Sequence, residues 1–122
     1  VGQIIVDSEP FIHSYGNELA NNTFLGRNAG NFTLDITSSS INDSNTALGA
    51  YTLNSLAGTV AGEGEYNTTV GCYGLTECTT GSNNTAIGMM SQRYLTTGVK
   101  NTSVGRSSLY GLVSGAYNTT IG

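Results

Sequence analysis

The chain has 122 residues, the length of one domain, and only 10% of them are charged, with a net charge of −4. Gly, Thr, Asn and Ser account for 60 of the residues, whereas Trp is absent and Pro occurs once. Because Lys and Arg are few and not clustered, we expect no nucleic-acid binding. No apolar run approaches the ~20 residues of a transmembrane helix, so we expect no membrane span. Titratable groups are scarce, so we predict that the chain is not an enzyme and has no catalytic residue and no cofactor.

Residues 1–16 differ in pattern from the rest of the chain. The stretch VGQIIVD is a short apolar run of β character, and EPFIHSYG adds aromatic side chains before a turn. We predict that segment 1–16 is an N-terminal cap over the first unit of the repeat that follows. The alternative is an assembly segment that docks on another chain. His13, the one histidine, is expected to be a surface or cap residue rather than a ligand.

One pentapeptide, Asn-Thr-x-aliphatic-Gly, recurs six times and defines a repeat domain over residues 17–122. Its copies are Asn22–Gly26, Asn45–Gly49, Asn67–Gly71, Asn84–Gly88, Asn101–Gly105 and Asn118–Gly122. Successive copies begin 23, 22, 17, 17 and 17 residues apart, which predicts a 17-residue repeat with insertions near 32–43 and 59–65. Leu recurs four and seven residues after the closing Gly, and a second turn with Gly follows.

A 17-residue unit is shorter than the helix-bearing repeats of common solenoids, which run from ~20 to 45 residues. Thr and the β-branched Ile or Val of the pentapeptide favour a strand, and the closing Gly favours a turn. We therefore predict an all-β fold, a parallel β-solenoid of about six coils. Each coil would contribute two or three short strands, and coils would stack about 4.8 Å apart.

Strand side chains alternate between two faces, so each column of the pentapeptide lies inside or outside the solenoid as a whole. We predict that the aliphatic column is the core ladder: Leu25, Leu48, Val70, Ile87, Val104 and Ile121. The Thr column would then also point inward, which disfavours ice binding, because that activity needs outward rows of Thr. The Asn column has two interpretations, a turn residue with left-handed geometry, which we favour, or a stacked amide ladder. Its members are Asn22, Asn45, Asn67, Asn84, Asn101 and Asn118.

Runs such as NTFLGRNAG and TTGSNNTAIG resemble the repeats of trimeric adhesins, phage-type fibres and large-virus surface proteins. The pattern is most similar to the left-handed parallel β-roll of trimeric autotransporter adhesin heads. The resemblance covers about Asn22–Gly122 and implies a left-handed β-roll, a homotrimer, and an extracellular, cell-surface or virion-surface location. The chain departs from those heads in its longer coil and in the insertions of its first units.

Cys72 and Cys78 lie six residues apart in one unit, and we predict a disulfide between them that contributes about 2 kcal/mol. The alternative is two free thiols in the coil core. Two Cys without a nearby His do not complete a tetrahedral metal site. Glu63 and Glu65 are expected to lie in a solvated loop, so we predict no metal.

Seven Asn-x-Ser/Thr sequons make the chain a candidate glycoprotein. The repeat itself creates some of them, because Asn-Thr followed by Thr or Ser is a sequon. The candidate glycosylation sites are Asn21, Asn31, Asn42, Asn67, Asn83, Asn101 and Asn118.

These features predict a structural protein whose partners are copies of itself, either as a trimer or as a filament. End-to-end stacking is one expectation, because the last pentapeptide ends at Gly122 with no cap after it. The alternative is an adhesin module that binds glycans or a host surface receptor through tyrosines that stack on sugars. The tyrosines concerned are Tyr51, Tyr66, Tyr73, Tyr94, Tyr110 and Tyr117.

Overall fold

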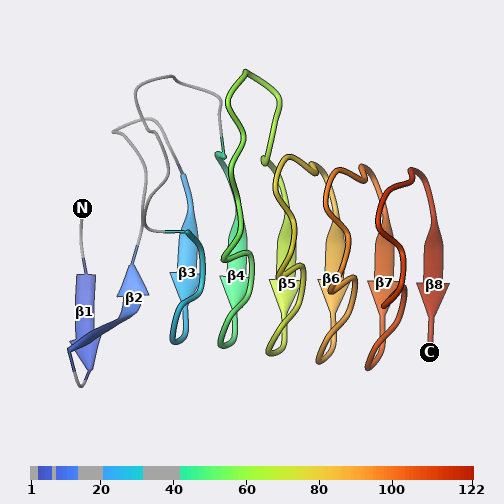
Figure 1. Cartoon of the computed structure of the whole chain (residues 1–122). Helices are drawn as coiled ribbons and strands as arrows, with labels where there is room; N and C mark the ends of the chain where they lie inside the picture. The colour runs from blue at the N-terminus through green and yellow to red at the C-terminus, as the bar shows by residue number, and fades with distance from the viewer. Residues whose placement is uncertain (1–2, 7, 14–20, 32–41) are drawn as a thin grey trace.

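The computed structural model describes residues 3–6, 8–13, 21–31 and 42–122, so most of the predicted insertion 32–43 lies outside the described residues. Within these ranges the chain is all-β, with one eight-stranded sheet whose strands follow the order of the sequence (Figure 1). The strands are β1 (Gln3–Val6), β2 (Glu9–His13), β3 (Thr23–Leu25), β4 (Thr46–Leu48), β5 (Thr68–Val70), β6 (Thr85–Ile87), β7 (Thr102–Val104) and β8 (Thr119–Ile121). The predicted parallel β-solenoid is confirmed.

Each copy of the pentapeptide forms one three-residue strand, and β3 to β8 pair in parallel without a shift in register. In β6 and β7, for example, Thr85 lies beside Thr102 and Ile87 beside Val104. The rest of each described coil consists of turns and bends, apart from an isolated bridge. The prediction of two or three strands per coil is therefore wrong, because the remaining residues are needed to turn the chain back to its starting point.

The N-terminal strands β1 and β2 form an antiparallel hairpin that continues the sheet beyond β3 (Figure 1). Strand β2 pairs antiparallel with β3, with Ile12 beside Leu25 and His13 beside Phe24. The hairpin thus occupies the edge of β3 that faces away from β4. Whether segment 1–16 acts as a cap or as an assembly segment stays a prediction.

The strand residue that points into the solenoid is the third residue of the pentapeptide. This column is buried in β3 to β7 and half-buried in β8: Phe24, Ala47, Thr69, Ala86, Ser103 and Thr120. The aliphatic column is exposed or half-buried, with Leu48 44% and Ile87 40% exposed: Leu25, Leu48, Val70, Ile87, Val104 and Ile121. The predicted core ladder is therefore wrong, because Asn and the third residue share one face and the buried amides place that face inside.

The apolar interior comes mainly from the second half of the coil. Its cluster comprises Phe24, Ala29, Ala47, Leu53, Leu56, Leu75, Cys78, Ala86 and Leu95. The two halves of a coil complement each other in volume. In the first coil the large Phe24 faces Gly30, where a Cβ atom would lie 2.5 Å from the Phe24 ring. In the next coil the small Ala47 is matched by Leu53, four residues after the closing Gly.

The Asn column forms a continuous amide ladder inside the solenoid. The backbone N–H of Asn84 donates to Asn67 Oδ1 at 3.0 Å, and Asn84 Nδ2 donates to the same oxygen at 3.1 Å and to the Gly98 carbonyl at 2.8 Å. Its own Oδ1 accepts from the N–H and from Nδ2 of Asn101, at 3.0 and 3.1 Å. Equivalent bonds join the other members of the column: Asn22, Asn45 and Asn118.

This ladder corrects the interpretation that we favoured for the Asn column. The residue with left-handed geometry is the one that precedes the ladder Asn in the last five units, such as Asn83 with φ of 61°. The repeat Asn itself enters the strand with its amide buried, as the stacked-ladder alternative requires.

The closing Gly of each pentapeptide that another coil follows is required by the close stacking of coils. Gly88 has φ of +124°, and a Cβ atom there would lie 2.5 Å from the carbonyl oxygen of Gly105 in the next coil. A side chain at this position would therefore meet rigid backbone as well as adopt a strained conformation.

Replacing Asn84 with Ala is expected to lower the free energy of unfolding by about 3 kcal/mol or more. The N–H and Nδ2 of Asn101 and the carbonyl of Gly98 each lose a hydrogen bond, and each buried polar group left unsatisfied costs about 1–3 kcal/mol. Urea unfolding followed by circular dichroism measures the change.

The matched control for this experiment is Asn83→Asp, which alters the adjacent exposed side chain. It is expected to change stability by no more than about 0.5 kcal/mol. Equal stabilities of the Asn84→Ala variant and the unmodified chain would contradict a structural role for the ladder.

Candidate functional site

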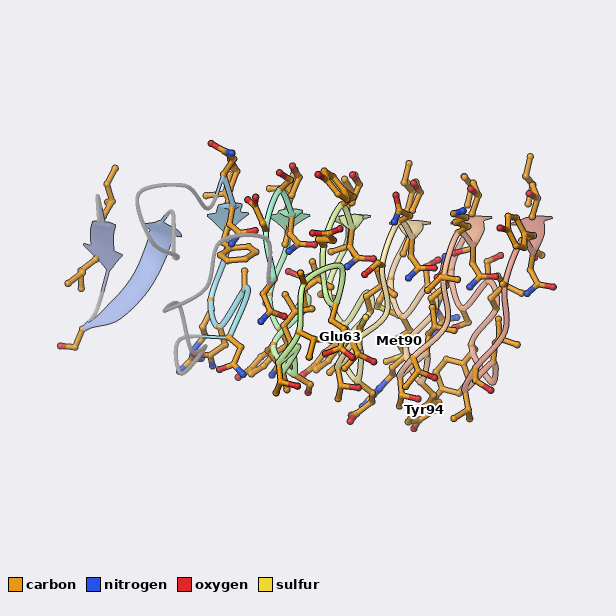
Figure 2. The ribbon with its side chains drawn as sticks, turned by 90° about the horizontal axis from the view of Figure 1, so that it is seen from above. Glu63, Met90 and Tyr94 are labelled. Carbon is orange, nitrogen blue, oxygen red and sulfur yellow. The ribbon has the colours of Figure 1, made fainter. Side chains whose placement is uncertain are left out.

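The outer surface of β3 to β8 is a regular array of two side-chain columns, which we call the Thr–aliphatic face. It consists of the aliphatic column listed above and the Thr column: Thr23, Thr46, Thr68, Thr85, Thr102 and Thr119. Five of these Thr residues are exposed, and Thr85 is half-buried. Figure 2 shows side chains standing outward along the row of strands, with Glu63, Met90 and Tyr94 on the opposite side of the coils.

The spacing on the Thr–aliphatic face follows from β geometry. Neighbouring strands lie about 4.8 Å apart, and the two columns lie about 6.6 Å apart along each strand. Because the strands pair in register, the array repeats from coil to coil without offset. The Thr column points outward, so the assumption that disfavoured ice binding is wrong.

The chemistry of this face is that of methyl groups and hydroxyls. None of its twelve residues is ionisable. Parallel sheets in proteins are usually covered on both faces, whereas among the described residues the coil interior covers the inner face of this sheet and leaves side chains of the outer face exposed. A contiguous exposed surface with so many aliphatic side chains is typical of a contact surface.

A second surface gathers aromatic and basic side chains, and we call it the Tyr–Arg cluster. The rings of Tyr51 and Tyr73 stack with centroids 5.1 Å apart and planes 3° apart. The Arg93 guanidinium carbon lies 5.0 Å from the centroid of Tyr73 and 5.5 Å from that of Tyr94. Tyr94 meets Tyr110 edge to face, with centroids 4.9 Å apart. The residues therefore form a continuous chain of contacts across several coils.

Tyr94 and Tyr110 are the exposed end of the Tyr–Arg cluster, at 38% and 36% exposure. The Tyr110 hydroxyl donates to the Tyr94 hydroxyl at 3.4 Å. This hydrogen bond, followed by the Coulombic effect of Tyr110, raises the pKa of Tyr94, so its phenol is protonated at neutral pH. The cluster thus offers aromatic edges, hydroxyl groups and one cation to a ligand.

The two remaining tyrosines of the predicted sugar-binding set lie elsewhere in the coil. Tyr66 and Tyr117 directly precede the repeat Asn and are 55% and 73% exposed. Lys100 Nζ donates to the Tyr117 hydroxyl at 3.2 Å and lies 5.2 Å from its ring centroid. This pair is solvated, so it contributes little to stability.

The two cysteines are free thiols, so the predicted disulfide is wrong. Cys72 directly follows the closing Gly of its unit and is half-buried. Cys78 lies in the core, at the position that Leu56 and Leu95 occupy in neighbouring coils, and its thiol donates to the Gly81 carbonyl at 3.5 Å. Burial raises the pKa of Cys78 to about 12. The alternative of two free thiols is what the fold contains, although only one of them is fully buried.

The folded chain engages the side-chain amides of five predicted glycosylation sites. Asn42, Asn67 and Asn101 are buried, and Asn31 and Asn118 are half-buried. Nδ2 donates to a carbonyl or amide oxygen in all five, so a glycan on any of these nitrogens would compete with a hydrogen bond of the fold. Glycosylation at these positions stays a prediction. Asn21 and Asn83 are exposed.

A buried polar group around Gln92 was not identified from the sequence. Gln92 occupies the position of Leu53, Leu75 and Leu109 in other coils, and this break in the Leu pattern was the available signal. Its Nε2 donates to the Thr85 carbonyl at 2.8 Å and to Ser103 Oγ at 2.9 Å.

The described part of the chain contains no group of three or more His, Cys, Asp or Glu side chains that could hold a metal ion. Glu63 instead accepts hydrogen bonds from the backbone N–H groups of Thr59 and Val60, at 2.8 and 3.3 Å, within its own loop. Over the same described residues, no helix is long and apolar enough to cross a membrane.

No protein-family model matches the chain, and neither a curated protein nor a solved structure shows significant similarity to it. The surfaces described above are therefore interpreted from their own geometry and chemistry.

The two thiols are expected to differ in reactivity. At pH 8 iodoacetamide should alkylate Cys72 in the folded chain at least tenfold faster than Cys78, because the thiolate is the reactive form and Cys78, with a pKa of about 12, is a buried thiol. In urea both should react at similar rates. Mass spectrometry of alkylated peptides measures the rates, and equal labelling in the folded chain would contradict the burial of Cys78.

Proposed function

We propose that the chain is a structural protein that associates with copies of itself through the Thr–aliphatic face and so builds a fibre or spike on a cell or virion surface. The observation that carries this proposal is the exposure of aliphatic side chains along the strands, with Leu48 44% and Ile87 40% exposed. Covering them would remove apolar surface from water at about 25 cal/mol per Å². The oligomer is expected to be a trimer or a filament, and the trimer follows from the sequence resemblance.

A second copy of the chain is the occupant that the chemistry of this face favours. The chain carries a net charge of −4, so surfaces that bear its carboxylates would repel each other. The Thr–aliphatic face bears no ionisable side chain, so copies can meet there without bringing like charges together. Each copy also presents the same regular repeat, so the columns of two faces can interdigitate over several coils. Closed symmetric oligomers use such self-complementary surfaces.

The test is the effect of charge on the Thr–aliphatic face. Sedimentation equilibrium of the unmodified chain should give an oligomer, and the double variant Val70→Lys/Ile87→Lys should raise the dissociation constant at least tenfold, about 1.4 kcal/mol, because it places desolvated like charges in the contact. Val113→Lys is the matched control, since Val113 is 57% exposed and lies outside this face. It should leave the oligomer intact, and circular dichroism should show the solenoid in all three proteins.

Two results would overturn this assignment. One is a monomer at millimolar concentration, and the other is an oligomer of unchanged stability in the Lys double variant. A monomer whose Thr–aliphatic face binds to and shapes growing ice crystals would assign the face to ice instead.

The Tyr–Arg cluster favours a second candidate function, the binding of glycans or a glycosylated host receptor. Exposed aromatic rings stack on the apolar faces of sugars, and the nearby Arg93 and tyrosine hydroxyls can bind sugar hydroxyls. On a glycan array, Tyr94→Ala should weaken binding about tenfold, whereas Tyr117→Ala should not. No binding at high protein concentration, or equal loss in the two variants, would remove this candidate.

A further inference from the structure

Three of the asparagines in the buried amide ladder also lie in Asn-x-Ser/Thr sequons for N-linked glycosylation. The third residue of the pentapeptide is Thr69, Ser103 or Thr120 in these coils, which completes the sequons of Asn67, Asn101 and Asn118. In the other three coils the third residue is Phe or Ala, and the ladder Asn is not an acceptor. The same side-chain nitrogen is therefore subject to two requirements, one from the fold and one from the modification.

The ladder uses the nitrogen atom to which a glycan would be attached. Asn67 Nδ2 donates to the Gly81 carbonyl at 2.8 Å. Asn101 Nδ2 donates both to the Gly115 carbonyl at 2.9 Å and to Asn84 Oδ1 at 3.1 Å, so both of its hydrogens are engaged. Asn67 and Asn101 are 0% exposed. No sugar fits between coils that are held together by these bonds.

Glycan transfer removes one of those hydrogens. A bond forms between Nδ2 and C1 of the first sugar, the bond from C1 to the pyrophosphate of the lipid carrier breaks, and the amide loses a proton. The product keeps a single N–H and carries a large hydrophilic group, so it can neither complete the ladder nor be buried.

We propose that glycosylation of the ladder asparagines and folding of the solenoid are mutually exclusive, so that this chain folds where the N-glycosylation machinery does not reach it. The transferase acts on extended, accessible acceptor segments, and the segments around Asn67 and Asn101 are accessible before the coils stack but buried afterwards. A chain that enters a glycosylating secretory compartment is modified first and then fails to fold. The inference rests on the amide ladder and does not depend on the proposed self-association.

The exposed Asn83 provides an internal comparison. It is adjacent to the ladder residue Asn84 and belongs to a sequon completed by Thr85, but its side chain lies outside the core. A glycan on Asn83 meets solvent and leaves the ladder intact, so it is compatible with the fold.

In the experiment, the full chain is directed into the secretory pathway of cultured animal cells. Protease-resistant material is then separated from aggregated material, and mass spectrometry measures the glycan occupancy of each Asn in both fractions. Occupancy of Asn67, Asn101 and Asn118 should be high in the aggregated fraction and at least tenfold lower in the protease-resistant fraction. Asn83 should be occupied in both. The same chain made in the bacterial cytosol should be protease-resistant throughout.

A variant that removes the sequons of the buried and half-buried asparagines tests whether glycosylation of these residues is what prevents folding. Thr33→Ala, Ser44→Gly, Thr69→Ala, Ser103→Ala and Thr120→Ala together abolish the sequons of Asn31, Asn42, Asn67, Asn101 and Asn118 while keeping these asparagines. Ala already occupies the third position at Ala47 and Ala86, and Gln92 Nε2, which loses Ser103 Oγ in this variant, keeps its hydrogen bond to the Thr85 carbonyl. The variant should be secreted in folded form, whereas Asn83→Asp, which removes an exposed sequon, should not restore secretion.

The glycan occupancy of the wild-type chain tests the proposal even if the five-substitution variant folds poorly when made in bacteria. Glycans on Asn67 or Asn101 in the protease-resistant fraction would overturn the proposal. So would secretion of folded wild-type chain with the ladder sites unoccupied and no aggregated, glycosylated fraction.

Discussion

The buried amide ladder is the interaction on which the rest of the fold depends. Asn84, in the middle of the ladder, accepts two hydrogen bonds from Asn101 through its side-chain oxygen and donates to Asn67 Oδ1 and to the Gly98 carbonyl through its side-chain nitrogen. These bonds join neighbouring coils and also hold the second turn of the same coil, which contains Gly98. A buried amide that lacks partners is costly, so the ladder tolerates one stacking register and disfavours the others. It therefore specifies the parallel, in-register sheet that apolar packing alone would leave free to slip.

Placing the amides inside determines what lies outside. Alternation along the strand puts the third residue beside the Asn in the core and sends Thr and the aliphatic residue to the surface. The interior of such a small coil is then filled by short side chains from the strand and by Leu from the second half, as Ala47 and Leu53 illustrate. The apolar column that would form the core of a larger fold is left available for contact with another molecule.

Much of the architecture could be predicted from the sequence, because a fixed spacing of Asn, Thr and Gly is a property of the chain itself. The all-β class, the parallel stacking of the coils and the register of the pentapeptides follow from that spacing, whereas the number of strands in each coil does not. The orientation of the side chains could not be predicted in the same way. Alternation along a strand shows that successive side chains lie on opposite faces, but it does not show which face points into the solenoid. The aliphatic column was assigned to the core on hydrophobicity, whereas the hydrogen-bonding requirement of Asn67 and Asn101 outweighs the burial of Val70 and Val104. The disulfide failed for a different reason. Cys78 lies seven residues after Gly71, where Leu56 and Leu95 lie in other coils, so its place in the Leu pattern indicated a core side chain, whereas the separation of the two cysteines did not indicate whether they pair.

Because the amides lie inside the solenoid, the residues that stabilise the coils are different from the residues that are available for association with another molecule. Directional bonds within the chain hold the coils together, so the Thr–aliphatic face can vary among Leu, Val and Ile without affecting the ladder. The third residue of the pentapeptide, in contrast, cannot vary freely, because it lies inside the coil. Ser103, for example, accepts a hydrogen bond from Gln92 and must also fit the interior. Thr or Ser at that position lies inside the coil and also completes a sequon with the ladder Asn two residues before it. The repeat is thus suited to the packing of the coil, and it restricts the chemical environment in which the chain can fold.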